Sequence, residues 1–190
     1  MEVVLATSNP GKARESRAIL EDSGIHVSTV PLWLGEVETG TTFEENARLK
    51  AAAALRMVHK PVLAEDAGLE VDALHGLPGV HSARFAGPAA TPAQNNAKLL
   101  RLLEGVTERE ARYRVVAVLL FPTGRIVTGE GTLDGRVTES PRGEGGFGYD
   151  PIFVPAGEER TVAEMGADEK NLMSHRAMAL RTLLGALEPS

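Results

Sequence analysis

The sequence predicts an α/β fold built around a mixed β-sheet. Short apolar runs at 3–6, 62–64 and 152–154 are typical of buried strands, and helical segments alternate with them. Two longer strand-like runs, 112–121 and 125–137, flank Pro122-Thr123-Gly124, which favours a hairpin. Because strand–helix alternation favours parallel pairing and a hairpin is antiparallel, we expect both kinds of pairing in one sheet.

The N-terminal elements follow from local signals. After the strand 3–6, a turn-rich loop over 7–11 leads into a helix over 10–22, with Pro10 in its first turn and Gly24 beyond its end. A second strand is predicted over 26–31. Thr42 and Glu45 form a capping-box pattern, which predicts a helix from 42 to about 57.

The strand 62–64 delivers Glu65 and Asp66 to its C-terminal end in this interpretation. Further on, the sequence predicts a turn at 77–80, a helix over 91–104 and the hairpin. The strand 152–154 and a last helix over 170–187 complete the chain.

Composition restricts the class of protein. The 190 residues are expected to form one domain, or one domain with two lobes. A net charge of −6 argues against a protein that coats nucleic acid. The lack of cysteine excludes disulfides, thiolate zinc sites and thiol nucleophiles. The first residues enter a strand directly and no apolar stretch approaches the length of a membrane span, so we expect a cytoplasmic protein.

The first candidate site segment lies between a strand and a helix start, where unpaired backbone N–H groups favour anions. It comprises Thr7, Ser8, Asn9, Pro10, Gly11 and Lys12. Ser8 and Asn9 add hydrogen-bond donors, and Lys12 adds a positive charge. The spacing is not that of a Walker A loop. The pattern predicts a phosphate cradle; a plain helix cap at Ser8 or Asn9 is the alternative.

The second segment is the acidic pair Glu65-Asp66, followed by Ala67 and Gly68. Two acids leaving a buried strand are costly unless a positive charge compensates them. Mg²⁺ is a suitable partner, and further carboxylates stand upstream at Glu36, Glu38, Glu44 and Glu45. The alternative is a solvated turn with both acids pointing outward.

The third segment is the glycine-rich loop 145–151. Phe147, Gly148 and Tyr149 offer an aromatic ring beside a flexible backbone, and Asp150 offers an acceptor. A flat base could stack there, although tight loops also occur for structural reasons.

Cationic residues near the C-terminus form the fourth segment. Lys170, His175 and Arg176 could bind phosphate or the acceptor edge of a base, or lie as surface charges at a helix start. Lys50 could reach a phosphate or extend to water.

Six motifs occur together in one order, and they resemble those of the inosine/xanthosine triphosphate pyrophosphatases, which act on noncanonical purine nucleotides. The motifs are Thr7-Ser8-Asn9-x-x-Lys12, Thr42-Phe43-x-Glu45-Asn46-Ala47-x-x-Lys50-Ala51, Ala64-Glu65-Asp66-x-Gly68-Leu69, Leu77-Pro78-Gly79-x-x-Ser82-Ala83-Arg84, Phe147-Gly148-Tyr149-Asp150-Pro151 and Ser174-His175-Arg176-Ala177. The similarity covers about residues 3 to 184.

The resemblance implies a two-lobed fold, a long mixed sheet flanked by helices, a nucleotide cleft between the lobes and a homodimer. It also implies Mg²⁺-dependent hydrolysis of ITP, dITP and XTP to monophosphate and pyrophosphate. Ala67 and Ser8 depart from the family pattern, which often has Ser and Gly there.

Roles can be assigned to these positions as hypotheses. Glu38 and Asp66 would hold Mg²⁺, with Glu36 an alternative to Glu38 and Glu65 a further candidate ligand. Asp66 would also orient or deprotonate the attacking water. Lys12, Lys50 and Lys170 would neutralise the triphosphate. For the base, Phe147 or Tyr149 would stack on the ring, Asp150 would accept its N1–H, and Arg176 would donate to keto oxygens.

Three alternatives remain open from sequence. One is a pyrophosphatase for other modified nucleotides, such as methylated pyrimidine triphosphates. Another is a nucleotide sensor that has lost catalysis, against which stand Lys12, Glu38 and Asp66. A nucleic-acid-binding module is disfavoured by the acidic balance.

Overall fold

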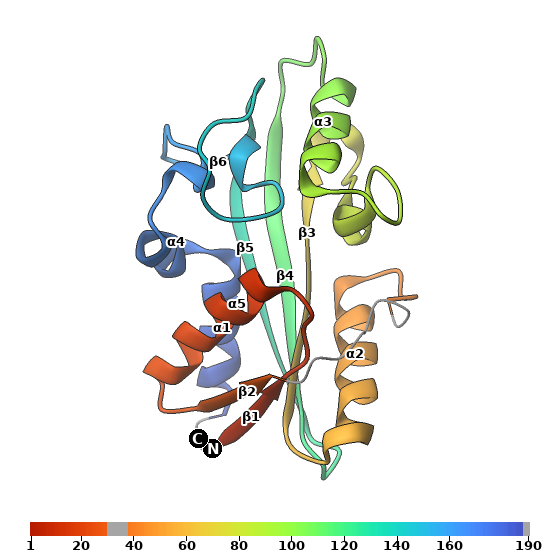
Figure 1. The fold of residues 1–190 in the computed structure, drawn as a ribbon, viewed down its shortest axis with the longest axis vertical. Helices are drawn as coiled ribbons and strands as arrows, with labels where there is room; N and C mark the ends of the chain where they lie inside the picture. The colour runs from red at the N-terminus through yellow and green to blue at the C-terminus, as the bar shows by residue number, and fades with distance from the viewer. Residues whose placement is uncertain (30–37, 188–190) are drawn as a thin grey trace. The chain divides into compact units, whose positions relative to one another are not determined.

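Six strands in the described part of the chain form one mixed sheet in the order β2-β1-β3-β4-β5-β6 (Figure 1). The computed structural model describes residues 1–29 and 38–187. The strands are β1 (Glu2–Leu5), β2 (His26–Thr29), β3 (Val62–Val71), β4 (Glu110–Leu120), β5 (Ile126–Val137) and β6 (Phe153–Pro155). β1 runs parallel to β2 and β3, and β5 runs antiparallel to β6. The predicted α/β class with a mixed sheet is confirmed.

Five α-helices lie within the described residues: α1 (Pro10–Asp22), α2 (Phe43–Val58), α3 (Pro92–Leu102), α4 (Ala167–Met173) and α5 (His175–Gly185). The chain divides into two compact units. Unit 1 comprises Met1–Asp66, Val115–Gly131 and Ser174–Ser190, and unit 2 comprises Ala67–Arg114 and Thr132–Met173. The strands β3, β4 and β5 therefore contribute residues to both units.

Unit 1 is organised around β1, whose Val3, Val4 and Leu5 are buried between β2 and β3. Helix α1 packs against α5, and in Figure 1 both lie on the opposite side of β3 from α2. The capping box that opens α2 is present, because Thr42 and Glu45 bond each other's backbone N–H groups. These elements place the N-termini of α1 and α2 in the unit that holds Glu65 and Asp66.

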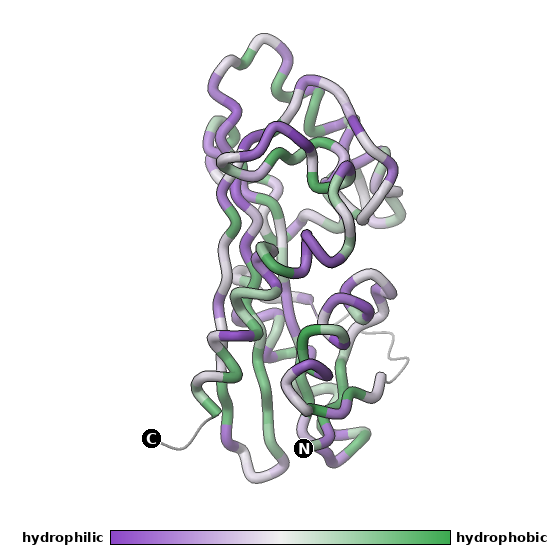
Figure 2. The backbone as a smooth tube through the Cα atoms, turned by 90° about the vertical axis from the view of Figure 1, so that its left-hand side faces the viewer, coloured by the Kyte–Doolittle hydropathy of each residue, from purple (hydrophilic) through white to green (hydrophobic). Residues whose placement is uncertain are grey.

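Strand β4 shows two burial patterns along its length. Val115–Leu120 is an almost continuously buried apolar run in unit 1, coloured green in Figure 2. Glu110–Arg114, in unit 2, alternates between buried and more exposed residues. Continuous burial is typical of a strand covered on both faces, and alternation is typical of a strand with one solvated face.

The core of unit 2 gathers buried residues from β3, α3, β4, β6 and the loop before β6, among them Leu69, Leu99, Tyr113, Tyr149 and Phe153. The rings of Tyr113 and Phe153 meet edge to face with centroids 4.7 Å apart. Tyr149 belongs both to this core and to the glycine-rich loop 145–151, so it anchors the loop to the core.

The sequence prediction for β3 was wrong in its length. The strand does not end at Ala64 but continues to Val71, so Glu65 and Asp66 lie inside it and not at its end. Gly68 and the acids suggested a stop. Leu69 and Val71, both fully buried, continue the strand, and ion pairs within unit 1 make burial of the acids tolerable.

The predicted last helix, 170–187, is two helices. Ser174 adopts an extended backbone between α4 and α5, and its hydroxyl accepts a hydrogen bond from the Ala177 N–H at 3.1 Å, so it caps α5. Lys170 consequently lies on α4 in unit 2, whereas His175 and Arg176 begin α5 in unit 1.

Two smaller points complete the comparison. The predicted strand 26–31 is observed to Thr29, and its last two positions fall outside the described residues. None of the helices in the described ranges has the length and apolar character needed to cross a membrane.

Candidate active site

The loop before α1 is held by its own side chains. Asn9 caps the helix, its Oδ1 accepting from the Gly11 and Lys12 N–H groups at 2.8 and 3.2 Å, and Thr7 Oγ1 accepts from the Asn9 N–H at 3.2 Å. Asn9 therefore performs the capping role that the sequence left open. Pro10 begins the helix and Ser8 is exposed, so the loop presents a hydroxyl and a helix N-terminus at the surface.

A buried ion cluster lies beside this loop in unit 1. Arg176, only 1% exposed, donates from Nε to both oxygens of Glu65 at 2.9 and 2.8 Å and from Nη1 to Glu15. Lys12 Nζ lies 3.9 Å from Glu65 Oε1. The negative charge of Glu65 is thus compensated by Arg176 from α5 and by Lys12 from α1.

The charges of this cluster support one another. Burial would raise the pKa of Glu65, but Arg176 and Lys12 outweigh it and hold that pKa below its usual value. Burial would lower the pKa of Arg176, and attraction to Glu65 and Glu15 raises it instead. Burial does lower the pKa of Lys12, with Glu65 opposing the shift. Glu65 therefore stays ionised, which maintains a negative charge next to Lys12.

Asp66 is the centre of a second ion cluster in unit 1. Lys50 Nζ, from α2, donates to Asp66 Oδ1 at 2.9 Å and to Glu38 Oε1 at 3.0 Å. Burial would lower the pKa of Lys50, but the two carboxylates outweigh it and raise that pKa. The solvated-turn alternative for the acidic pair is wrong, since Glu65 and Asp66 are 3% and 5% exposed.

The oxygens of Glu38 and Asp66 converge on one positive charge, the ammonium of Lys50. Two hard oxygen donors aimed at one cation fit Mg²⁺, which typically takes one or two protein carboxylates together with waters and substrate phosphates. No group of three or more His, Asp or Glu side chains suited to a metal occurs in residues 1–29 and 38–187. The alternative ligand Glu36 lies outside those ranges.

The two other upstream acids have different tasks. Glu45 accepts hydrogen bonds from Thr41 and Thr42 as part of the α2 cap, and Glu44 pairs with Arg48 on the exposed face of that helix. Of the upstream acids that the structure describes, Glu38 is therefore the one that pairs with Lys50.

The loop 145–151 in unit 2 is organised by Asp150. This buried carboxylate accepts from Tyr113 OH at 3.1 Å, from the Phe147 N–H at 2.8 Å and from Lys170 Nζ at 2.7 Å. Gly146, with φ of 72°, must lack a side chain because a Cβ would collide with the Asp150 carboxylate. Asp150 therefore fixes the loop conformation.

The two aromatic rings of the loop differ in exposure. Tyr149 is 4% exposed, and its hydroxyl donates to the Ser82 carbonyl at 2.9 Å. Phe147 is only partly buried, and Lys170 Nζ lies 4.3 Å from its ring centroid. Phe147 is consequently the ring that can offer a face to a base.

The predicted site residues thus fall into two groups. Unit 1 holds the loop 7–12 together with Glu38, Lys50, Glu65, Asp66, His175 and Arg176, and unit 2 holds Ala67, Phe147, Gly148, Tyr149, Asp150 and Lys170. His175 is buried at the first position of α5, and Ala67 follows Asp66 in β3.

Sequence reasoning missed two polar residues of unit 1. Glu15 was not assigned a role, although a charged residue on the inner face of α1, four positions after the buried Gly11, needs a partner. Asn46 was part of a motif without a role. It is fully buried and donates to Asp66 Oδ2 at 3.0 Å.

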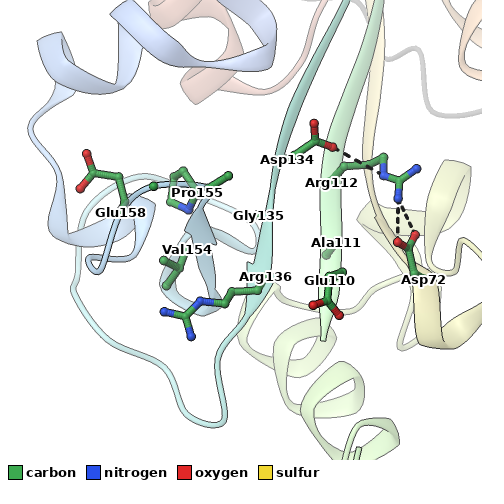
Figure 3. Close-up of a pocket in the computed structure, with 12 residues that line it drawn as sticks. Asp72, Glu110, Ala111, Arg112, Asp134, Gly135, Arg136, Val154, Pro155 and Glu158 are labelled. Atoms are coloured by element: carbon green, nitrogen blue, oxygen red, sulfur yellow. Dashed lines mark hydrogen bonds and ion pairs between the residues drawn. The ribbon is translucent and has the colours of Figure 1, made fainter. Parts of the chain in front are cut away.

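A pocket of about 390 Å³ in unit 2 contains none of these residues (Figure 3). Arg112 lies in this pocket between Asp72 and Asp134 and pairs with both, its Nη2 2.6 Å from Asp72 Oδ1. Its ion pairs, those of Arg112 with Asp72 and Asp134, are partly exposed, and the rest of the lining includes uncharged residues of β6 such as Val154 and Pro155, unlike the buried charge clusters of unit 1.

Comparison with known proteins gives consistent matches along the whole chain. The model of the Ham1 family matches residues 3–186. A protein of Exiguobacterium sp. named dITP/XTP pyrophosphatase is 47% identical over 192 residues, covering 100% of this chain and 98% of its own. A protein of the same name from Bacillus subtilis is 45% identical, covering 98% and 97%.

Solved structures agree. The Staphylococcus aureus Ham1 protein superposes with a TM-score of 0.85 at 38% identity, covering 98% of both chains. A nucleoside-triphosphatase, dITP/XTP pyrophosphatase, from Mycobacterium abscessus gives 0.77 at 40% identity, covering 99% and 100%. With a family match over nearly the whole length and relatives well above 30% identity, the chain belongs to the Ham1 family.

Proposed function

We propose that this protein hydrolyses dITP, ITP and XTP to the nucleoside monophosphate and pyrophosphate, which removes these nucleotides before they enter DNA or RNA. The observation that carries the proposal is the pair of buried carboxylates on β3, Asp66 held by Lys50 and Glu65 held by Arg176 and Lys12 in unit 1. Full-length relatives named dITP/XTP pyrophosphatase support it. The cytoplasm, where nucleoside triphosphates are used, is the proposed location.

The metal and phosphate roles follow from the two ion clusters. Glu38 and Asp66 would hold Mg²⁺, with Glu65 a further candidate ligand. When bound, the ion supplies charge neutralisation on the phosphates and lowers the pKa of coordinated water. The helix N-terminus at residues 7–11 and the cations Lys12 and Lys50 suit the triphosphate, and Lys170 is proposed to assist them.

Cleavage requires a water oxygen to form a bond to Pα while the bond from Pα to the bridging oxygen breaks, releasing pyrophosphate. Asp66 is proposed to orient this water and take its proton. Each of its oxygens already accepts one hydrogen bond in the structure, from Lys50 and from Asn46. Because a carboxylate oxygen has two lone pairs, both retain capacity for a further partner.

Base selection is assigned to Phe147, Asp150 and Arg176. Phe147 would stack on the purine, since Tyr149 lies in the core. Adenine carries an amino group at position 6 and guanine carries one at position 2. Hypoxanthine and xanthine carry neither group. Donors such as the Arg176 guanidinium would donate hydrogen bonds to keto oxygens and disfavour an amino group at the same place. Leaving such buried donors unpaired can yield discrimination between bases of about 10⁴-fold.

A homodimer is part of the proposal and rests on the resemblance to the pyrophosphatases. Light scattering coupled to gel filtration measures it directly: the dimer corresponds to twice the chain mass of 20.2 kDa.

The experiment that tests this function is a substrate panel. Purified protein is incubated with Mg²⁺ and dITP, ITP, XTP, ATP, GTP or dTTP, with EDTA replacing Mg²⁺ in a parallel series, and the products are separated by chromatography. We expect monophosphate and pyrophosphate from the first three, little turnover of ATP and GTP, and none with EDTA.

Other outcomes would redirect the proposal. Turnover confined to methylated pyrimidine triphosphates would favour the related enzyme class, and binding without turnover would favour a sensor. Salt-sensitive retention of DNA or RNA in a gel would revive a nucleic-acid-binding module. The same panel on Arg176→Lys, which keeps the charge and loses the planar fork, tests base reading: an unchanged ITP to GTP preference would contradict it.

A further inference from the structure

Asn46 connects the two carboxylates proposed to hold the metal. Its side chain is fully buried in the first turn of α2. Nδ2 donates to Asp66 Oδ2 at 3.0 Å, and Oδ1 accepts from the Gly40 N–H at 2.8 Å. Gly40 stands two residues after Glu38, so the amide joins Asp66 to the segment that carries Glu38.

Lys50 closes a ring with these groups. Its ammonium bonds Asp66 Oδ1 at 2.9 Å and Glu38 Oε1 at 3.0 Å. The two carboxylates are therefore connected twice, once through a cation and once through Asn46 and the backbone at Gly40. With Oδ2 held by Asn46, the Asp66 carboxylate cannot rotate freely, and Oδ1 remains directed toward Glu38 and Lys50.

An amide of this length suits the position chemically. The group must donate to a carboxylate at one end and accept from a backbone N–H at the other, which an asparagine does and a leucine of similar shape cannot. An aspartate would accept at Gly40 but would set a second negative charge against Asp66.

Gly40 is fitted to the same contact. A Cβ at this position would lie 2.8 Å from Asn46 Oδ1 and 2.7 Å from Glu45 Cβ, closer than ordinary packing allows. The absence of a side chain thus lets the Gly40 N–H reach the amide oxygen.

We infer that Asn46 is a positioning residue: it fixes which oxygen of Asp66 faces the proposed metal and holds the Glu38 segment in register with it. The inference rests on the proposed function. Partners that orient metal ligands typically change metal affinity or activity by about 10- to 100-fold when removed, although they touch neither metal nor substrate.

The test uses Asn46→Leu in the full chain. Mn²⁺ binding without nucleotide is measured by electron paramagnetic resonance, and kcat and KM for dITP are measured with Mg²⁺. We expect the Mn²⁺ dissociation constant to rise about tenfold and kcat to fall about 10- to 100-fold, with KM changed by less than about threefold. If Asn46→Leu does not fold, Gly40→Ala perturbs the same amide without removing a polar group and should move both quantities in the same direction.

Asn95→Leu is the matched control. Asn95 is also buried and bonded at both ends, to the Ala86 N–H and the Ala83 carbonyl, but it belongs to unit 2. The Asn95→Leu protein should lose thermal stability while its Mn²⁺ affinity and its kcat for dITP stay those of the wild type.

The possible failures are distinguishable. An Asn46→Leu protein that behaves like Asn95→Leu, beside a wild type that binds Mn²⁺ and cleaves dITP, would overturn the role of Asn46 alone. A wild type that neither binds Mn²⁺ nor cleaves dITP would overturn the proposed function and this role with it.

Discussion

Replacing Asp66 by asparagine is expected to lower kcat for dITP by about 10³-fold and to change KM by only a few fold. The amide has the shape of the carboxylate, but it cannot take a proton from water, and because it is neutral it binds a hard cation more weakly than a carboxylate does. Lys12 remains in place, and Lys50 retains Glu38, so nucleotide binding should persist. Steady-state kinetics at saturating Mg²⁺ measure both constants.

Asp72→Asn is the control for that substitution. Asp72 follows the end of β3 and pairs with Arg112, but its side chain is 54% exposed. The same chemical change there should leave kcat within about twofold, because an exposed ion pair contributes little. Near-normal turnover by Asp66→Asn would rule out its assigned role.

The second large effect is expected for Arg176→Ala, as a loss of about 3–5 kcal/mol in the free energy of unfolding. The guanidinium is 1% exposed and serves both Glu65 and Glu15. Its removal leaves two buried carboxylates without their principal cation, and a buried charge without a partner is strongly unfavourable. Urea denaturation at neutral pH gives the difference between variant and wild type.

Arg160→Ala is the comparison, because Arg160 has as many glutamate partners as Arg176 but is exposed where Arg176 is buried. Arg160 also pairs with two glutamates, Glu158 and Glu169, but on the surface. Its removal should cause little measurable change. Equal stability of the Arg176→Ala and wild-type proteins would mean that the buried cluster does not need its cation.

Much of the fold was predictable because local signals agreed with the tertiary structure. Pro10 and Asn9 mark the start of α1, and the capping box at Thr42 and Glu45 marks the start of α2. The hairpin of β4 and β5 follows from its turn residues. The family named from six ordered motifs is confirmed by the family match over residues 3–186.

What sequence could not supply were the partners of buried charges. Glu65 and Asp66 suggested the end of a strand, because acids are seldom buried. Their burial depends on Arg176, which is 111 residues from Glu65 in the chain, and on Lys50. Pairing at that separation leaves no local trace, and the partners of Glu15 and Asn46 likewise emerged only in the structure. The roles of the individual site residues remain predictions.

The most direct test of the account is hydrolysis of dITP in H₂¹⁸O, with mass spectrometry of both products. Attack of water on Pα, oriented by Asp66, predicts one ¹⁸O atom in dIMP and none in pyrophosphate. The label in pyrophosphate would mean attack on Pβ, and release of labelled orthophosphate would mean cleavage at Pγ. Either result would contradict the proposed reaction.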